Sequence, residues 1–159
     1  MRIQIRAIGN YKNTPETGLI QDYLKRLETG RAIGISQVAI QEIKSTRARQ
    51  GEDIKALEAD KLMTGVPAGA CVVALDERGK NITSHAFAEL LNQSLQAGHR
   101  DMVFMIGGAD GLADTIRHNA QHVLSLGKMT LPHLLARLVL AEQLWRGVSI
   151  LTNHPYHRD

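Results

Sequence analysis

The end of the chain, TNHPYHRD at residues 152–159, combines side chains that are suited to chemistry. The imidazoles of His154 and His157 and the phenol of Tyr156 can take part in proton transfer, and Arg158 can contact phosphate. Chain ends are commonly frayed and dispensable. This segment is therefore an idle tail, a metal-binding segment or one edge of an active site.

A metal site is the least favoured of these three readings. His133 lies upstream of His154 and His157, so three imidazoles are available. Zinc sites of this kind, however, normally add cysteine or carboxylate ligands at recognisable spacing. Pro155 disfavours a helical pair of histidines, and Cys71 lies in the apolar run ACVVAL, where we expect a buried, inert thiol. We expect no bound metal.

Three loops could bind a ligand, and the first of them follows Leu75. IGGADG at 106–111 follows an apolar run, but it matches neither the dinucleotide fingerprint nor a P-loop, so by itself it predicts only a tight turn. SLGKMTLPH at 125–133 alternates Leu126, Met129 and Leu131 around the flexible Gly127. It could form a slot for an adenine ring, or its apolar side chains could fill the core.

Hydrophobic periodicity predicts strands that alternate with helices. Strands are expected at 2–8, 37–43, 70–75, 102–106 and 122–126. Helices are expected at 15–30, 54–62, 84–98 and 132–146, together with a short helix that ends at 116. DERGK at 76–80 is predicted to be a turn, Thr14 and Ser84 to be helix caps, and 45–52 to be a basic surface loop. This order predicts one α/β domain over 1–159, with a parallel sheet and helices on both faces.

The last predicted helix is apolar nearly all round. Leu134, Leu138 and Trp145 lie on one side, whereas Leu140 and Leu144 lie towards the other. A helix of this kind is buried on several sides. Either it is central in one chain, or a second subunit covers part of it in a homodimer.

Composition sets broad limits. The chain has 159 residues, a net charge of +3 and 43% hydrophobic residues, which suits a globular protein and neither requires nor excludes a nucleic-acid partner. The first residues lack an apolar signal-peptide core, and no apolar run is long enough to cross a membrane. With a single cysteine, we expect a cytoplasmic protein.

Three stretches together resemble a known family. FMIGGADGL at 104–112, LSLGKMTLPHLLARLVLAEQLWR at 124–146 and the ending NHPYHRD are similar to the ribosomal RNA large subunit methyltransferase H family of the SPOUT superfamily. That family methylates N3 of a pseudouridine in 23S ribosomal RNA. The resemblance implies a C-terminal deep trefoil knot, with the knot and the cofactor site within about 71–159.

The resemblance also implies a cofactor, partners and residue roles. The cofactor would be S-adenosylmethionine, and the protein would act as a homodimer on the assembled ribosome. The matching cofactor positions are Leu75, Gly107, Leu126, Gly127, Lys128, Met129, Thr130 and Leu131.

The remaining implied roles concern the substrate. Tyr156 or His157 would handle the proton and place the base, and Arg137 would stabilise the imide anion or grip phosphate. His154 and Arg158 would contact RNA. The plainer alternatives are a Tyr156 ring that packs the tail onto the domain and an Arg137 that pairs with Glu142 or another acid.

Two other functions remain open from the sequence. One is a nicotinamide-dependent oxidoreductase, which the missing dinucleotide fingerprint disfavours. The other is a non-catalytic, dimeric ribosome-binding factor that keeps the fold without the chemistry.

Overall fold

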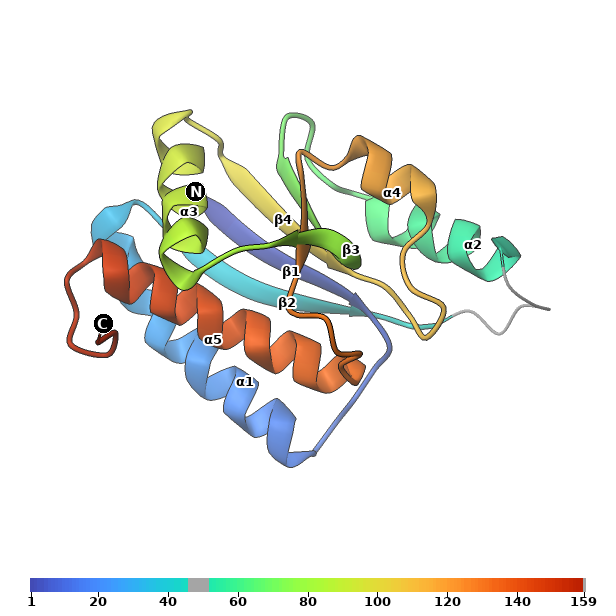
Figure 1. Cartoon of the computed structure of the whole chain (residues 1–159), viewed down its shortest axis with the longest axis horizontal. Helices are drawn as coiled ribbons and strands as arrows, with labels where there is room; N and C mark the ends of the chain where they lie inside the picture. The colour runs from blue at the N-terminus through green and yellow to red at the C-terminus, as the bar shows by residue number, and fades with distance from the viewer. Residues whose placement is uncertain (46–51, 159) are drawn as a thin grey trace.

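The computed structural model describes residues 1–45 and 52–158, and a five-stranded sheet runs through its centre (Figure 1). The strands are β1 (Arg2–Ile8), β2 (Gln37–Ile43), β3 (Cys71–Asn81), β4 (Asp101–Ile106) and β5 (His122–Ser125). Their order is β2-β1-β4-β3-β5, and each pair is parallel. The predicted parallel sheet is confirmed. Most of the predicted basic loop at 45–52 lies outside the described residues.

Helices cover both faces of this sheet (Figure 1). One face carries α1 (Pro15–Arg26), α3 (Ser84–Gln96) and α5 (His133–Leu151), and the other carries α2 (Glu52–Met63) and α4 (Asp114–Asn119). Successive side chains of β1 point to opposite faces of the sheet, so this strand contributes to the core on both faces. Ile3 and Ile5 pack in the larger core cluster with α1, α3 and α5, whereas Ile8 packs in the second cluster.

The turn predicted at DERGK is wrong, because β3 continues through these residues to Asn81. The register between β3 and β5 shifts between Leu75 and Lys80, so the residues between them bulge from the ladder. A Cβ atom on Gly79 would lie 2.5 Å from the carbonyl carbon of Leu124. Residues typical of turns therefore form a bulge here, and the absence of a side chain at Gly79 lets β3 approach β5 closely after the bulge.

Two helix boundaries also differ from the prediction. Thr83, not Ser84, caps α3, since its hydroxyl accepts a hydrogen bond from the Ala86 N–H at 3.1 Å. At the end of α5, the helix passes the predicted stop at Arg146 and continues to Leu151. Gly147 lies inside the helix, where a Cβ atom would come within 2.9 Å of the Leu91 side chain.

The start of α1 agrees with the sequence, but its end does not. Thr14 caps the helix as predicted, and the hydroxyls of Thr14 and Thr17 satisfy each other's backbone N–H groups. The helix ends at Arg26, and a 3-10 helix, η1 (Leu27–Ile33), replaces the predicted last turn.

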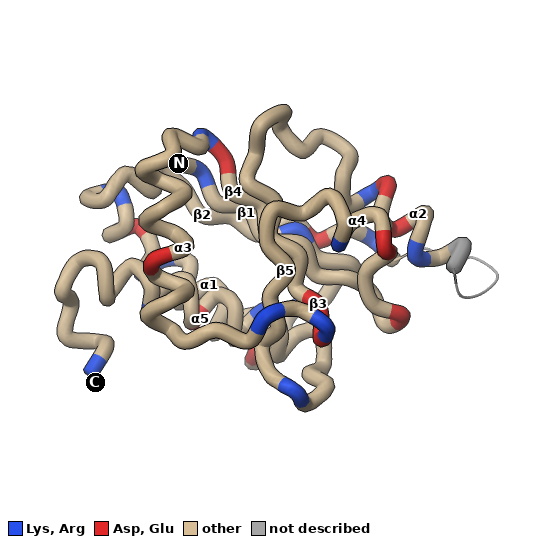
Figure 2. The backbone as a smooth tube through the Cα atoms, turned by 45° about the horizontal axis from the view of Figure 1, so that its top comes forward, with Lys and Arg blue, Asp and Glu red and all other residues tan. Residues whose placement is uncertain are grey.

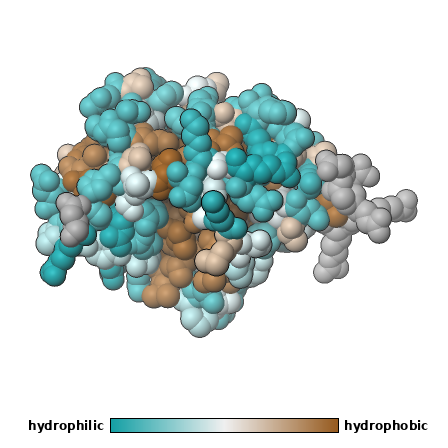
Figure 3. All heavy atoms as spheres, viewed as in Figure 1, coloured by the Kyte–Doolittle hydropathy of each residue, from teal (hydrophilic) through white to brown (hydrophobic). Residues whose placement is uncertain are grey.

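The chain itself buries most of α5. Leu140, Leu144 and Val148 are fully buried in the core cluster that includes residues of α1 and α3. Leu134, Leu138 and Val139 are half-buried, whereas Leu135 is 39% exposed and Leu19 of α1 is 49% exposed. Hydrophobic residues appear at the surface over α1 and α5 in Figure 3. A central position thus explains most of the apolar character of α5, and the homodimer remains a prediction.

Within the described residues, no helix has both the length and the apolar character that a membrane span requires.

A buried ion pair joins the start of α5 to the ends of β1 and β2. The Arg137 guanidinium is fully buried and donates to the Glu42 carboxylate at 2.6 Å, to the Ile8 carbonyl at 2.6 Å and to the Gly9 carbonyl at 3.1 Å. It also stacks over the Tyr11 ring at 4.8 Å. Burial lowers the pKa of Arg137, and the Glu42 carboxylate opposes this shift.

We predict that Arg137→Met lowers the free energy of unfolding by about 3 kcal/mol, because it removes the cationic partner of the Glu42 carboxylate, which keeps only the Tyr11 N–H, and a donor to two carbonyls. Denaturant unfolding measures this change. Arg2→Met is the matched control, since Arg2 forms a surface pair with Asp101 whose loss should cost less than about 1 kcal/mol. Equal losses in the two variants would contradict the prediction.

Candidate functional site

A cavity of about 260 Å³ lies at the carboxyl ends of β4 and β5 and beside the bulge within β3. In parallel sheets this edge is the usual place for a ligand. The lining comes from residues 75–78, 106–112, 125–127, 129–131 and from Arg117, His133 and Ala136. The loops singled out from the sequence thus line one site. Along the end of β3, acidic and basic positions follow one another (Figure 2).

The structure brings the predicted cofactor residues together, with one exception. Leu75, Gly107 and residues 126–127 and 129–131 all line the cavity, whereas Lys128 does not. Met129 is 83% exposed at its edge, so its side chain is available to a ligand rather than packed in the core. The loop at 125–133 therefore fits the binding alternative better than the core-filling one.

The glycines of IGGADG serve packing within the chain. A Cβ atom on Gly107 would lie 2.6 Å from the carbonyl carbon of Gly111, and an isolated bridge joins Gly108 to Gly111. Gly111 has a φ of +81°, a region that favours glycine. The tight turn predicted from the sequence is present. Its glycines bring the main chain of the loop close together beside the cavity.

An ion pair that sequence reasoning missed connects two walls of the cavity. Arg117 on α4 donates to the Asp76 carboxylate at 3.1 Å and to the Leu112 carbonyl at 2.5 Å. Asp76 lies in the bulge of β3, and its other carboxylate oxygen accepts from the Arg78 N–H at 3.0 Å. In the sequence, an acidic residue directly after a buried strand was the only signal of this contact.

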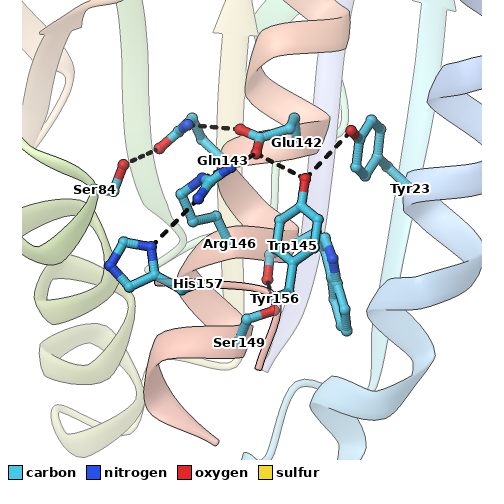
Figure 4. A network of polar contacts seen from close by, with 9 residues as sticks. All are labelled: Tyr23, Ser84, Glu142, Gln143, Trp145, Arg146, Ser149, Tyr156 and His157. Carbon is cyan, nitrogen blue, oxygen red and sulfur yellow. Dashed lines mark hydrogen bonds and ion pairs between the residues drawn. The ribbon is translucent and has the colours of Figure 1, made fainter. Parts of the chain in front are cut away.

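The C-terminal tail packs against α5 of its own chain through a polar network (Figure 4). The Tyr156 hydroxyl donates to the Glu142 carboxylate at 3.0 Å and lies 3.4 Å from the Tyr23 hydroxyl. Arg146 donates to the same Glu142 oxygen at 2.9 and 2.5 Å and stacks over the Tyr156 ring at 4.9 Å. The Trp145 ring also packs against the Tyr156 ring, and the two ring centroids lie 5.6 Å apart.

His157 continues this network towards α3. Arg146 Nη1 lies 3.3 Å from His157 Nδ1, and His157 Nε2 lies 3.1 Å from His85 Nε2. Because a guanidinium can only donate, Nδ1 accepts and the ring proton of neutral His157 is on Nε2. His157 then donates to His85. These two contacts thus place the ring proton of His157 on Nε2.

Burial raises the pKa of Tyr156, and its hydrogen bonds with Tyr23 and Glu142 act in the same direction. The phenol therefore stays protonated at neutral pH. Tyr156 is a hydrogen-bond donor and not a base in this arrangement.

The structure does not bring the tail to the cavity of its own chain. The cavity lies at the first turn of α5, and the tail follows its last turn. A helix of 19 residues spans about 27 Å at 1.5 Å per residue. Within one subunit, therefore, the tail is docked on α5 and does not line the cavity. His154, which packs edge-on against Trp145, and Arg158 are exposed at this far end.

Arg137 does not line the cavity either. Its guanidinium is buried and pairs with Glu42, as in the alternative that Arg137 forms an ion pair with an acid. The acid is Glu42 rather than Glu142, which pairs with Arg146.

The described residues contain no group of three or more histidine, cysteine or acidic side chains placed to hold a metal ion. Cys71 is buried as predicted, and burial raises the pKa of its thiol.

Known proteins are similar to this chain over nearly its whole length. Residues 1–157 match the family model of a predicted SPOUT methyltransferase. Among curated relatives, the ribosomal RNA large subunit methyltransferase H of Paramagnetospirillum magneticum is 46% identical over 158 residues, covering 99% of each chain. The protein of the same name from Agrobacterium fabrum is 46% identical over 159 residues, again covering 99% of each chain.

Solved structures support the same fold. A probable methylase family protein from Haemophilus influenzae superposes with a TM-score of 0.51 at 15% identity, covering 99% of this chain and 70% of that one. At this identity the likeness concerns the fold alone. With the family model and the full-length relatives, it leads to one conclusion: the chain belongs to the SPOUT methyltransferase family.

Proposed function

We propose that this protein is an S-adenosylmethionine-dependent methyltransferase that modifies N3 of a pseudouridine in 23S ribosomal RNA of the assembled ribosome. One observation carries the proposal. In a member of a methyltransferase family, the loops at 106–111 and 125–131 together line one cavity that follows the parallel strands β4 and β5 and adjoins the bulge of β3.

The residues present suit this cofactor. Leu75, Leu126 and Leu131 offer apolar surface to an adenine ring, and the glycine-rich turns present main-chain donors and acceptors to its edge. Glu77 and Asp110 also line the cavity and can favour a cation such as a sulfonium. We infer that the matching positions bind it; Lys128 would contribute through its backbone.

When bound, S-adenosylmethionine supplies an electrophilic methyl group. N3 of a pseudouridine is a weakly acidic imide, so its proton must leave before or during attack. Because the raised pKa keeps Tyr156 protonated, we assign proton removal to His157, whose Nδ1 must first give up its contact with Arg146 to accept the proton. We give Tyr156 the placing of the base, by stacking or by donating a hydrogen bond. We assign His154 and Arg158 to RNA contacts and Arg137 to holding the end of β1 for the site.

The distance between cavity and tail makes a homodimer part of the proposal. Because the tail packs along α5 of its own chain and does not line that chain's cavity, we infer that it acts on the cavity of a partner subunit. A two-fold pair of antiparallel α5 helices would place each tail beside the other chain's cavity and cover the exposed Leu135 and Leu19. The trefoil knot and the cytoplasmic location, where ribosomes are found, stay predictions of the resemblance.

No observation favours the other functions considered. The cavity loops lack the dinucleotide fingerprint, and a binding factor without chemistry would not need an intact cofactor cavity.

The reaction is tested with ribosomes that lack the modification. We expect labelled methyl from S-adenosylmethionine to appear on one pseudouridine of 23S RNA in assembled ribosomes, with far less on free RNA. Thr130→Arg, which puts a long cation into the cavity, should abolish labelling, whereas Glu89→Gln on the exposed surface of α3 should not. Labelling of a different nucleotide would refute the substrate assignment.

Mixed dimers test whether the tail acts across subunits. One subunit carries Thr130→Arg with an intact tail, and the other lacks residues 152–159 but keeps an intact cavity. Each homodimer should be inactive. The mixed dimer should recover about half of the wild-type rate, because one of its two sites is complete. An inactive mixed dimer would show that tail and cavity must belong to one chain.

Alkaline titration tests the state of Tyr156. Its pKa is raised, so the protonated phenol stabilises the docked tail below the ordinary tyrosine pKa of about 10, and this stabilisation is lost as pH rises further. Of the 3 tyrosines, one should ionise late in the absorbance of the phenolate, and Tyr156→Phe should remove that late step. A late step that persists in Tyr156→Phe would assign it elsewhere.

A further inference from the structure

Glu58 on α2 is a buried carboxylate that the proposed mechanism does not use. The residue is 3% exposed, and its Oε1 atom accepts a hydrogen bond from the Ser45 hydroxyl at 3.0 Å. Burying a carboxylate costs several kcal/mol unless it gains specific contacts, and alternatives such as leucine would pack without this cost. The contacts of Glu58 therefore need an explanation.

The carboxylate packs directly behind the glycine loop of the cavity. A Cβ atom on Gly108 would lie 2.5 Å from Glu58 Oε2 and 3.1 Å from Oε1, so the carboxylate occupies the space that a side chain at 108 would need. Gly108 itself lines the cavity. A single residue of main chain thus separates Glu58 from the ligand space.

The helix that carries Glu58 is held firmly against the sheet. Ala59 and Leu62 are buried in the core cluster that includes Ile8 and residues of β3 and β4. Beyond the end of α2, Arg6 of β1 donates to the Thr64 carbonyl at 2.6 Å. Glu58 is therefore a fixed support and can transmit the position of α2 to the loop.

We propose that Glu58 is a positioning residue for the methyl-donor site: its carboxylate supports the main chain at Gly108 from outside and, through Ser45, couples it to the segment after β2. This inference rests on the proposed function, because it takes the cavity as the donor site. Glu58 touches no ligand and acts through the loop.

The test is a double-mutant cycle on binding of S-adenosylhomocysteine, measured by calorimetry at a temperature where circular dichroism shows every variant folded. Glu58→Ala removes the support and should weaken binding about tenfold, as should Gly108→Ala, whose new methyl group collides with the carboxylate. In the double variant, the loss of the Glu58 carboxylate makes room for the methyl group that Gly108→Ala adds. The combined loss should therefore stay near tenfold instead of about a hundredfold.

Two controls separate positioning from a general loss of stability. Glu58→Gln keeps the shape and the acceptor for Ser45, and should bind within about threefold of wild type. Asp60→Ala removes an exposed carboxylate from the same helix and should change nothing. A role in stability alone would lower the melting temperature of Glu58→Ala and leave the affinity of the folded protein unchanged.

The outcomes distinguish this inference from the function on which it rests. If wild type fails to bind S-adenosylhomocysteine, both fall. If wild type binds but the two losses multiply, or Glu58→Ala or Glu58→Gln behaves contrary to these expectations, the assignment of Glu58 is overturned while the donor site stands.

Discussion

Close main-chain packing at the ends of β4 and β5 and at the bulge of β3 is the constraint on which the site depends. Gly107 lies against the backbone of Gly111, Gly79 lies against that of Leu124, and neither approach leaves space for a Cβ atom. The turns are therefore compact, and their peptide groups remain near the cavity. A parallel sheet brings these turns to one edge because all its strands end there. Arg117 and Asp76 then join the turn after β4 to the bulge of β3.

The helix α5 determines how this site relates to the tail. Its first turn borders the cavity, it packs between α1 and α3, and its middle and second half hold the tail through Glu142 and Arg146. A rigid helix between the two sets of residues keeps them apart in one chain. The proposed dimer rests on this separation combined with the apolar surface that remains near Leu135.

Much of this was accessible from the sequence, for physical reasons. Alternating and apolar runs predicted the strands, and glycine-rich loops after them indicated where a ligand could bind. Long-range pairings were not accessible: Arg137 with Glu42 and Glu58 with Gly108 join residues that no local pattern connects. Residues typical of turns at 76–80 form a bulge rather than a turn, because β3 pairs with β5 again after these residues. The distance from tail to cavity depended on the true length of α5, which passes through Gly147.

Hydrogen–deuterium exchange with and without S-adenosylhomocysteine tests the central claim most directly, that the main chain of these two turns binds the methyl donor. The account predicts slower exchange of backbone amides in segments 106–112 and 125–131 when the ligand is present, with little change in β2 at the opposite edge of the sheet. Saturated ligand binding with unchanged exchange in both segments would contradict it.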